Sequence, residues 1–154
     1  MAKDKDRVRM YSLNPSNGKI KQLQAKEDVI SDYSIANQAF EMVYFGLSAS
    51  NSQRLYTYNL KNDASSCLID LSKEILRDVT LGEVQDWNFV SAQGDTIYGR
   101  FYLPPHFDAT KKYPMIVNYY GGTTPTARVM ESRYPSHVYA GLGYIVYIIQ
   151  ASGA

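Results

Sequence analysis

The pattern of hydrophobic and polar positions predicts a chain built mainly of β-strands. Residues 115–119 and 144–149 are two short, almost wholly apolar runs, typical of strands buried on both faces of a parallel sheet. Between them, residues 136–142 predict a helix, with Ser136 as its N-cap and Gly143 as its stop. Strand, helix and strand in this order predict a right-handed crossover.

A predicted hairpin precedes these runs. Residues 84–91 and 96–103 are two strand patterns, joined by a turn at residues 92–95 with Gly94 at its tight position. In the second strand, apolar residues alternate with residues of mixed polarity. This pattern predicts an antiparallel hairpin with one face covered by other parts of the chain. Two prolines then end the ladder, because neither can donate a backbone hydrogen bond.

The first half of the chain contains a repeat at an offset of 45 residues. The segment Arg9-Met-Tyr-Ser-Leu-Asn14 matches Arg54-Leu-Tyr-Thr-Tyr-Asn59, and each copy is followed by a polar turn and a second strand pattern. The first copy predicts strands at 8–13 and 20–23, and the second predicts strands at 54–60 and 66–71. Residues 29–35 and 40–47 predict two further strands between the copies.

This arrangement is typical of a β-propeller, whose blades contain four strands and repeat every 40 to 50 residues or so. Residues 1–83 would then form about one and a half blades, ending in a charged linker at 73–83. The alternative is an unrelated β-meander with similar hairpins. The fold class is therefore mixed and β-rich, with partial blades followed by the first strands of a second sheet.

Composition supports a β-rich globular chain and excludes several partners. Fourteen tyrosines suit pleated strands, and a net charge of +1 gives no attraction to nucleic acid. No run of eighteen apolar residues predicts a membrane span, and the charged N-terminus does not resemble a signal peptide. Cys67, expected to be half buried, cannot form an internal disulfide, and no metal site or cofactor is predicted.

Candidate catalytic groups are few. The chain has no Gly-x-Ser-x-Gly motif; Gly46-Leu-Ser-Ala-Ser50 lacks the second glycine and lies where a hairpin should turn. Ser152 follows a strand but precedes no helix, and His106 and His137 are expected to be surface or packing residues. The strand at 113–119 ends before a Gly-Gly pair, which permits a sharp turn and a close approach of ligand to backbone.

Three runs resemble a known family. The segments 87–108, Lys111-Lys-Tyr-Pro-Met-Ile-Val-Asn-Tyr-Tyr-Gly-Gly122 and Ala140-Gly-Leu-Gly-Tyr-Ile-Val146 resemble the prolyl oligopeptidase family of serine peptidases. Within this family, the three runs most resemble the dipeptidyl peptidase IV and acylaminoacyl peptidase branches. It implies that residues 1–83 are the end of a β-propeller. Residues 84–154 would be the N-terminal part of an α/β-hydrolase domain, cut before its nucleophile.

The resemblance also implies one site. Tyr120 matches the family's oxyanion tyrosine, and Gly121 and Gly122 match its substrate loop, whereas Thr123 replaces a proline that the family often has. The parent protein would cleave short peptides by acyl transfer through a Ser-His-Asp triad. This chain contains none of that triad and is expected to be inactive alone. The resemblance is compatible with a periplasmic or other extracytoplasmic location.

Two alternatives remain open. The chain could be a non-catalytic β-rich binding or structural module, or a fragment of an esterase of the same fold. It ends directly after a strand, where a free domain rarely ends. A cut fragment is expected to self-associate through its exposed sheet edges, whereas a stand-alone module is expected to be a monomer.

Overall fold

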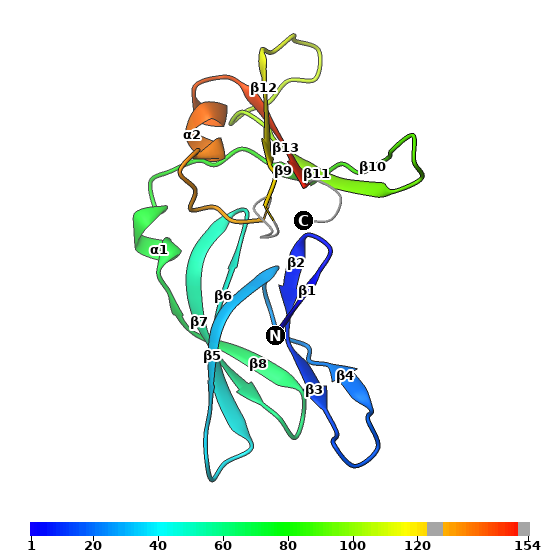
Figure 1. Cartoon of the computed structure of the whole chain (residues 1–154). Helices are drawn as coiled ribbons and strands as arrows, with labels where there is room; N and C mark the ends of the chain where they lie inside the picture. Colours follow the sequence, from blue (N-terminus) through cyan, green and yellow to red (C-terminus); the bar gives the residue numbers. More distant parts are fainter. Residues whose placement is uncertain (123–127, 151–154) are drawn as a thin grey trace.

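The computed structural model describes residues 1–122 and 128–150. Its described strands form a six-stranded, a five-stranded and a two-stranded sheet. Figure 1 shows the five-stranded sheet and α2 at one end of the molecule and the other two sheets at the opposite end. The elements are β1 (Ala2–Asp4), β2 (Arg7–Arg9), β3 (Tyr11–Leu13), β4 (Ile20–Gln22), β5 (Val29–Ile35), β6 (Glu41–Ser48), β7 (Asn51–Asn59), β8 (Ala64–Asp70), α1 (Ser72–Ile75), β9 (Val84–Asp86), β10 (Phe89–Val90), β11 (Thr96–Tyr102), β12 (Met115–Tyr120), α2 (Ser136–Gly141) and β13 (Ile145–Gln150).

The strands β5, β6, β7 and β8 form an antiparallel meander, as expected for one propeller blade. The predicted pair at 29–35 and 40–47 is confirmed as β5 and β6. The hairpin of β1 and β2, which the sequence pattern did not predict, extends this sheet. It joins the edge of β5 through a parallel pairing of Val8 with Val29.

The two copies of the repeat form equivalent hairpins. Tyr11 lies opposite Gln22 in the β3–β4 pair, and Tyr56 lies opposite Cys67 in the β7–β8 pair. Adding 45 to the residue numbers of the other two β3–β4 pairs likewise gives two residue pairs of β7 and β8. The repeat therefore preserves strand register as well as sequence, and the predicted equivalence of the two hairpins is confirmed.

The core of this half is a cluster of buried side chains that come mainly from β5, β6 and β7. Tyr44 and Tyr56 stack with ring centroids 5.1 Å apart, and Tyr58 meets Tyr44 edge-on. The hydroxyl of Tyr44 accepts a hydrogen bond from the Lys26 N–H at 2.8 Å and donates one to the Ser65 Oγ at 2.9 Å. Met10 from the first copy packs into the same cluster. Several of the tyrosines thus pack as core residues.

Met10 also explains one wrong prediction. Residues 8–13 were predicted as one strand, but the strand breaks at Met10 into β2 and β3. β2 joins the six-stranded sheet and β3 pairs with β4, so one segment serves two sheets. The buried Met10 side chain lies at the change of direction.

The second sheet has the order β10-β11-β13-β12, with β9 also paired to β11. β12 and β13 are parallel, from Met115 opposite Ile145 to Tyr120 opposite Gln150, so the predicted strand–helix–strand unit is confirmed. Helix α2 contributes Ala140 to a core with Tyr102 and Val146. This is the start of a parallel sheet preceded by an antiparallel hairpin, as the fold class predicted.

Four details differ from the prediction, and the first two concern this half. The strand at 84–91 is interrupted at Trp87, whose ring packs against Phe101 and Tyr147. The strand β11 does not have only one covered side, because Arg100 and Tyr102 on one face and Ile97 on the other are all buried. The linker at 73–83 is not wholly irregular, since α1 covers its beginning. Cys67 is exposed and not half buried.

One face of β12 is open. Met115, Val117 and Tyr119 alternate along it, and all three are more than half exposed. The sequence pattern is typical of a strand buried on both faces, but this face of β12 is not covered by the described residues. On the residues described, no helix has the length and apolar character needed to cross a bilayer. The same residues contain no group of three or more His, Cys, Asp or Glu side chains placed to hold a metal ion.

The buried hydroxyl of Tyr44 gives the first prediction. Tyr44→Phe keeps the ring stack but leaves the Lys26 N–H and the Ser65 hydroxyl without this partner, so the free energy of unfolding should fall by about 1 to 3 kcal/mol. Tyr33→Phe, on an exposed ring of the neighbouring strand, should change it by less than about 0.5 kcal/mol. Urea denaturation of both variants measures the difference; equal effects would contradict the prediction.

Candidate functional site

The candidate site lies at the carboxyl end of β12, where Tyr120 is the last residue of the strand. Side chains alternate along a strand, so Tyr120 shares a face with Asn118 and Ile116, while Tyr119 points to the other face. Tyr120 is 52% exposed. The two adjacent tyrosines therefore point to opposite faces, and Tyr120 is on the side of β12 that α2 covers.

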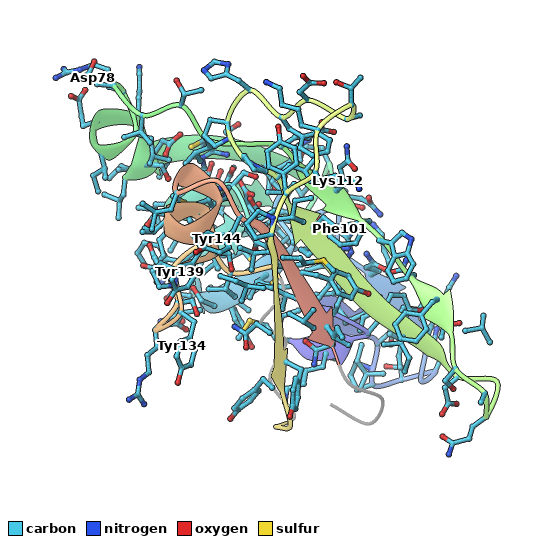
Figure 2. The ribbon with its side chains drawn as sticks, turned by 90° about the horizontal axis from the view of Figure 1, so that it is seen from above. Asp78, Phe101, Lys112, Tyr134, Tyr139 and Tyr144 are labelled. Carbon is cyan, nitrogen blue, oxygen red and sulfur yellow. The ribbon has the colours of Figure 1, made fainter. Side chains whose placement is uncertain are left out.

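Tyr120 borders an open groove of about 500 Å³. A smaller hollow of about 180 Å³ adjoins it and shares Asn118 and Tyr134 with it. Figure 2 shows Tyr134 and Tyr139 on the α2 side of β12, with Phe101 on the far side of the sheet. The residues lining the larger groove are Asn118, Tyr119, Tyr120, Ser132, Arg133, Tyr134 and Ile148. The groove is thus walled by β12 and by the segment that leads into α2.

The position of the Tyr120 ring explains why residue 122 is a glycine. Neither Gly121 nor Gly122 has a positive φ, so the turn does not require the conformational freedom of glycine. A Cβ added to Gly122 would clash with the ring of Tyr120 and lie 2.6 Å from its hydroxyl oxygen, whereas a Cβ on Gly121 would meet nothing. The predicted substrate-loop residue Gly122 therefore leaves space for Tyr120, and its Cα lies beside the tyrosine hydroxyl.

The buried Arg128 anchors the segment that leads into α2. Arg128 is 7% exposed and donates to three carboxylates: Nε to Asp6 at 2.6 Å, Nη1 to Asp28 at 2.9 Å and Nη2 to Asp86 at 2.9 Å. Asp6 follows β1, Asp28 precedes β5 and Asp86 ends β9. One side chain therefore ties the loop after β12 to both sheets.

Two more arginines complete this cluster. Arg7 pairs with Asp28, and Arg100 pairs with Asp86, so three guanidinium groups face three carboxylates. Burial alone would raise the pKa of Asp86, but the hydrogen bond from Arg128 and the charges of Arg100 and Arg128 hold it below its ordinary value. The carboxylate is therefore charged at neutral pH.

The tip of the β6–β7 hairpin contacts the same segment. The Met130 N–H donates to the Ser48 carbonyl at 3.1 Å, and the Ser52 hydroxyl donates to the Glu131 carboxylate. Ala49 is buried in the core of the second sheet, beside Ala140. The predicted hairpin turn at Gly46-Leu-Ser-Ala-Ser50 is confirmed, and it forms part of the contact between the two sheets.

His137 on α2 makes the last of these contacts. Its Nε2–H donates to the Ala49 carbonyl at 2.8 Å, and its ring packs edge-on against Tyr102. Its Nδ1 is buried without a hydrogen-bond partner among the residues described. Burial lowers the pKa of His137, and the hydrogen bond to Ala49 offsets only part of this effect. His137 is therefore a packing residue, as expected, while His106 is an exposed loop residue with φ of 58°.

The sequence did not predict the arginine cluster. Arg128 lies 122, 100 and 42 positions from its three partners, and a single arginine in a loop shows no periodicity or motif. Tyr120, Gly121 and Gly122 were proposed from a resemblance, and the structure brings Tyr120 and Gly122 together. Thr123 and Ser152, also considered in the sequence, lie outside the described residues.

Comparisons with known proteins give a consistent result. The chain is 29% identical to dipeptidyl-peptidase 5 of Porphyromonas gingivalis over 89% of its own length and 20% of that protein. It is 34% identical to human dipeptidyl peptidase 8 over 51% of its length and 9% of that protein. No family model matches it.

Solved structures give the same fold. The AtxE2 isopeptidase superposes with a TM-score of 0.75 at 18% identity, covering 95% of this chain and 22% of the isopeptidase. The acylaminoacyl peptidase of Pyrococcus horikoshii gives 0.70 at 18% identity, covering 86% and 20%. The chain therefore spans about one fifth of the length of these peptidases, and the resemblance to the prolyl oligopeptidase family is supported by both comparisons.

The environment of His137 gives the second prediction. Because its pKa is lower in the folded chain than the ordinary value of 6.5, the unfolded chain takes up a proton first as the pH falls, and stability is lost below about pH 6.5. The loss is at most about 1.4 kcal/mol per pH unit. His137→Gln should reduce this slope and His106→Gln should keep it, as measured by urea denaturation at pH 7.5 and 5.5. A slope unchanged by His137→Gln would contradict the assignment.

Proposed function

From its similarity in sequence and in fold to peptidases of the prolyl oligopeptidase family, we propose that the chain is part of a serine-type peptidase and supplies its oxyanion tyrosine. In this proposal residues 1–83 are the end of a β-propeller, and residues 84–154 are the N-terminal part of an α/β-hydrolase domain. The substrate is a short peptide whose scissile bond is broken by acyl transfer. The serine, histidine and aspartate of the triad belong to other parts of that peptidase.

The position of Tyr120 is the observation that supports this role. Ligands of open α/β sheets bind beyond the carboxyl ends of the strands, and Tyr120 ends β12 beside an open groove. Attack on an amide carbonyl places negative charge on its oxygen. A phenolic O–H positioned against that oxygen stabilises the transition state, and a donor of this kind contributes about 3 to 4 kcal/mol. The absence of a side chain at Gly122 leaves space for this hydroxyl.

The open strand supports a further proposal about association. Among the described strands β12 pairs only with β13, so its other edge has unpaired backbone groups. The exposed Met115, Val117 and Tyr119 lie on one face of the same strand. We propose that the isolated chain self-associates through this edge and face.

The third prediction concerns activity of the chain alone. The chain has no Gly-x-Ser-x-Gly motif, and a fluorophosphonate requires an activated serine, so the purified chain should not be labelled. Ser48 donates to the Asn51 side chain, and its partners give it no catalytic base. Intact-mass analysis after incubation with the probe measures labelling. Stoichiometric labelling of any serine would contradict the proposal.

The fourth prediction concerns Tyr120 and the glycine beside its ring in the full-length peptidase. Tyr120→Phe should lower kcat by about a hundredfold or more and change KM little, because the oxyanion bond forms mainly in the transition state. Gly122→Ala should also lower kcat, since its methyl group would displace the Tyr120 ring.

Gly141→Ala, at the end of α2, is the control, because a Cβ at that position meets nothing within 4 Å outside its chain neighbours and its own helix. It should keep kcat within about twofold of the parent value. Steady-state kinetics on one chromogenic peptide amide would compare all three variants. A Tyr120→Phe variant with unchanged kcat would refute the oxyanion role.

A further inference from the structure

The contacts of the segment 128–137 extend the site into the first half of the chain. We propose that Arg128 is a positioning residue: by binding Asp6 and Asp28, it sets the place of the groove wall beside Tyr120, and through it the orientation of the Tyr120 hydroxyl. The inference rests on the proposed oxyanion role of Tyr120. It assigns a catalytic consequence to the propeller half, which contains none of the reacting groups.

The first step is that this segment and Tyr120 line the same groove. Ser132, Arg133 and Tyr134 form the wall of the groove opposite Tyr120 and Asn118. Within the segment, the Tyr134 N–H donates to the Ser132 Oγ at 3.1 Å, which fixes the wall as one turn. A displacement of this wall therefore changes the space around the Tyr120 ring.

The second step is that the first half of the chain holds the segment. Four of its residues, Arg128, Met130, Glu131 and His137, contact that half. Their partners come from two places, the sheet edge and the tip of the β6–β7 hairpin. These partners are Asp6, Asp28, Ser48, Ser52 and Ala49. Only Asp86 among the partners of Arg128 belongs to the second sheet.

The third step is that Arg128 is the strongest of these anchors. Its guanidinium group uses Nε, Nη1 and Nη2 on three different carboxylates, a geometry that a lysine ammonium cannot reproduce. Arg128 and Asp6 are 7% and 4% exposed, so the pair is shielded from water and salt. Removing the arginine would leave the buried Asp6 with the Arg7 Nε, 3.9 Å away, in place of a contact at 2.6 Å, and the segment would have to move to hydrate the carboxylate.

Arg54 provides a matched control for general destabilisation. It also binds two carboxylates, Glu27 at 3.0 Å and Asp70 at 2.9 Å, but both lie within the first half of the chain. Arg54 thus has a similar type of ion pair without contact to the segment 128–137. If activity were lost only because the propeller half is destabilised, replacing either arginine should cause the loss.

The test uses the full-length peptidase and steady-state kinetics on one peptide amide. Arg128→Met should lower kcat by about tenfold or more, and Arg128→Lys, which keeps the charge but not the three-way geometry, should lower it less. Arg54→Met should lower the unfolding temperature but leave kcat within about twofold of the parent value. Equal losses of kcat for Arg54→Met and Arg128→Met would overturn the positioning role.

A double-variant cycle distinguishes this inference from the oxyanion role itself. If Arg128 acts through Tyr120, then Arg128→Met should add less than about twofold to the loss already caused by Tyr120→Phe. Full multiplication of the two losses would overturn the inference and leave the role of Tyr120 intact. An unchanged kcat in Tyr120→Phe alone would instead refute the proposed function.

A milder variant covers the case in which Arg128→Met does not fold. Ser52→Ala removes the hydroxyl that binds Glu131, another anchor of the same segment, at an exposed position. It should lower kcat by about twofold to fivefold, and Ser66→Ala, on β8 away from the segment, should not. Equal kcat values for these two variants, together with a parent-like Arg128→Lys, would overturn the inference.

Discussion

The fold depends on one buried ionic contact, the binding of Arg128 to Asp6, Asp28 and Asp86. The six-stranded and five-stranded sheets share no strand. Their other contacts among the described residues include the tip of the β6–β7 hairpin, whose Ala49 reaches the second core, and the Lys5 ammonium group over the Tyr98 ring. A buried ion pair does not stabilise a protein much compared with apolar packing, but breaking one costs about 3 to 5 kcal/mol because the remaining charge is unpaired. The main effect of the cluster is therefore to determine the relative position of the two sheets. Its contribution to the stability of either sheet is smaller.

Each sheet is otherwise explained by local rules. The β7–β8 hairpin and its earlier copy keep the same register because residues 45 positions apart face the same core, with Met10 and Tyr44 in one cluster. The β12–α2–β13 unit forms because two apolar strands flank a short helix whose Ala140 fits between them. The open face of β12 follows from the same unit, since one helix covers one face.

These local rules are also what made much of the fold predictable from the sequence. The offset of 45 residues, the apolar runs and the turn at Gly94, whose φ is 90°, are visible in the sequence because they depend on neighbouring residues. The break at Met10 and the burial of Arg100 depend on distant partners, so a period of two in the pattern led to wrong boundaries and a wrong exposed face. Arg128 could not be found in this way, because a buried arginine and an exposed one look identical in a single sequence. Tyr120 was proposed only through a resemblance to a family.

The site itself shows how such distant contacts matter. An oxyanion donor is effective when its hydroxyl is held in place before the charge develops. Tyr120 is about half exposed, so the packing of its own sheet does not hold the ring, and the missing side chain of Gly122 lets the ring lie against the backbone. The position of the ring then depends on the walls of the groove, and the wall formed by Ser132, Arg133 and Tyr134 follows the segment that Arg128 anchors. In the function we propose, the oxyanion donor on one sheet is therefore oriented by carboxylates of the other, which gives the proposed propeller half a physical reason to stay joined to the proposed hydrolase half.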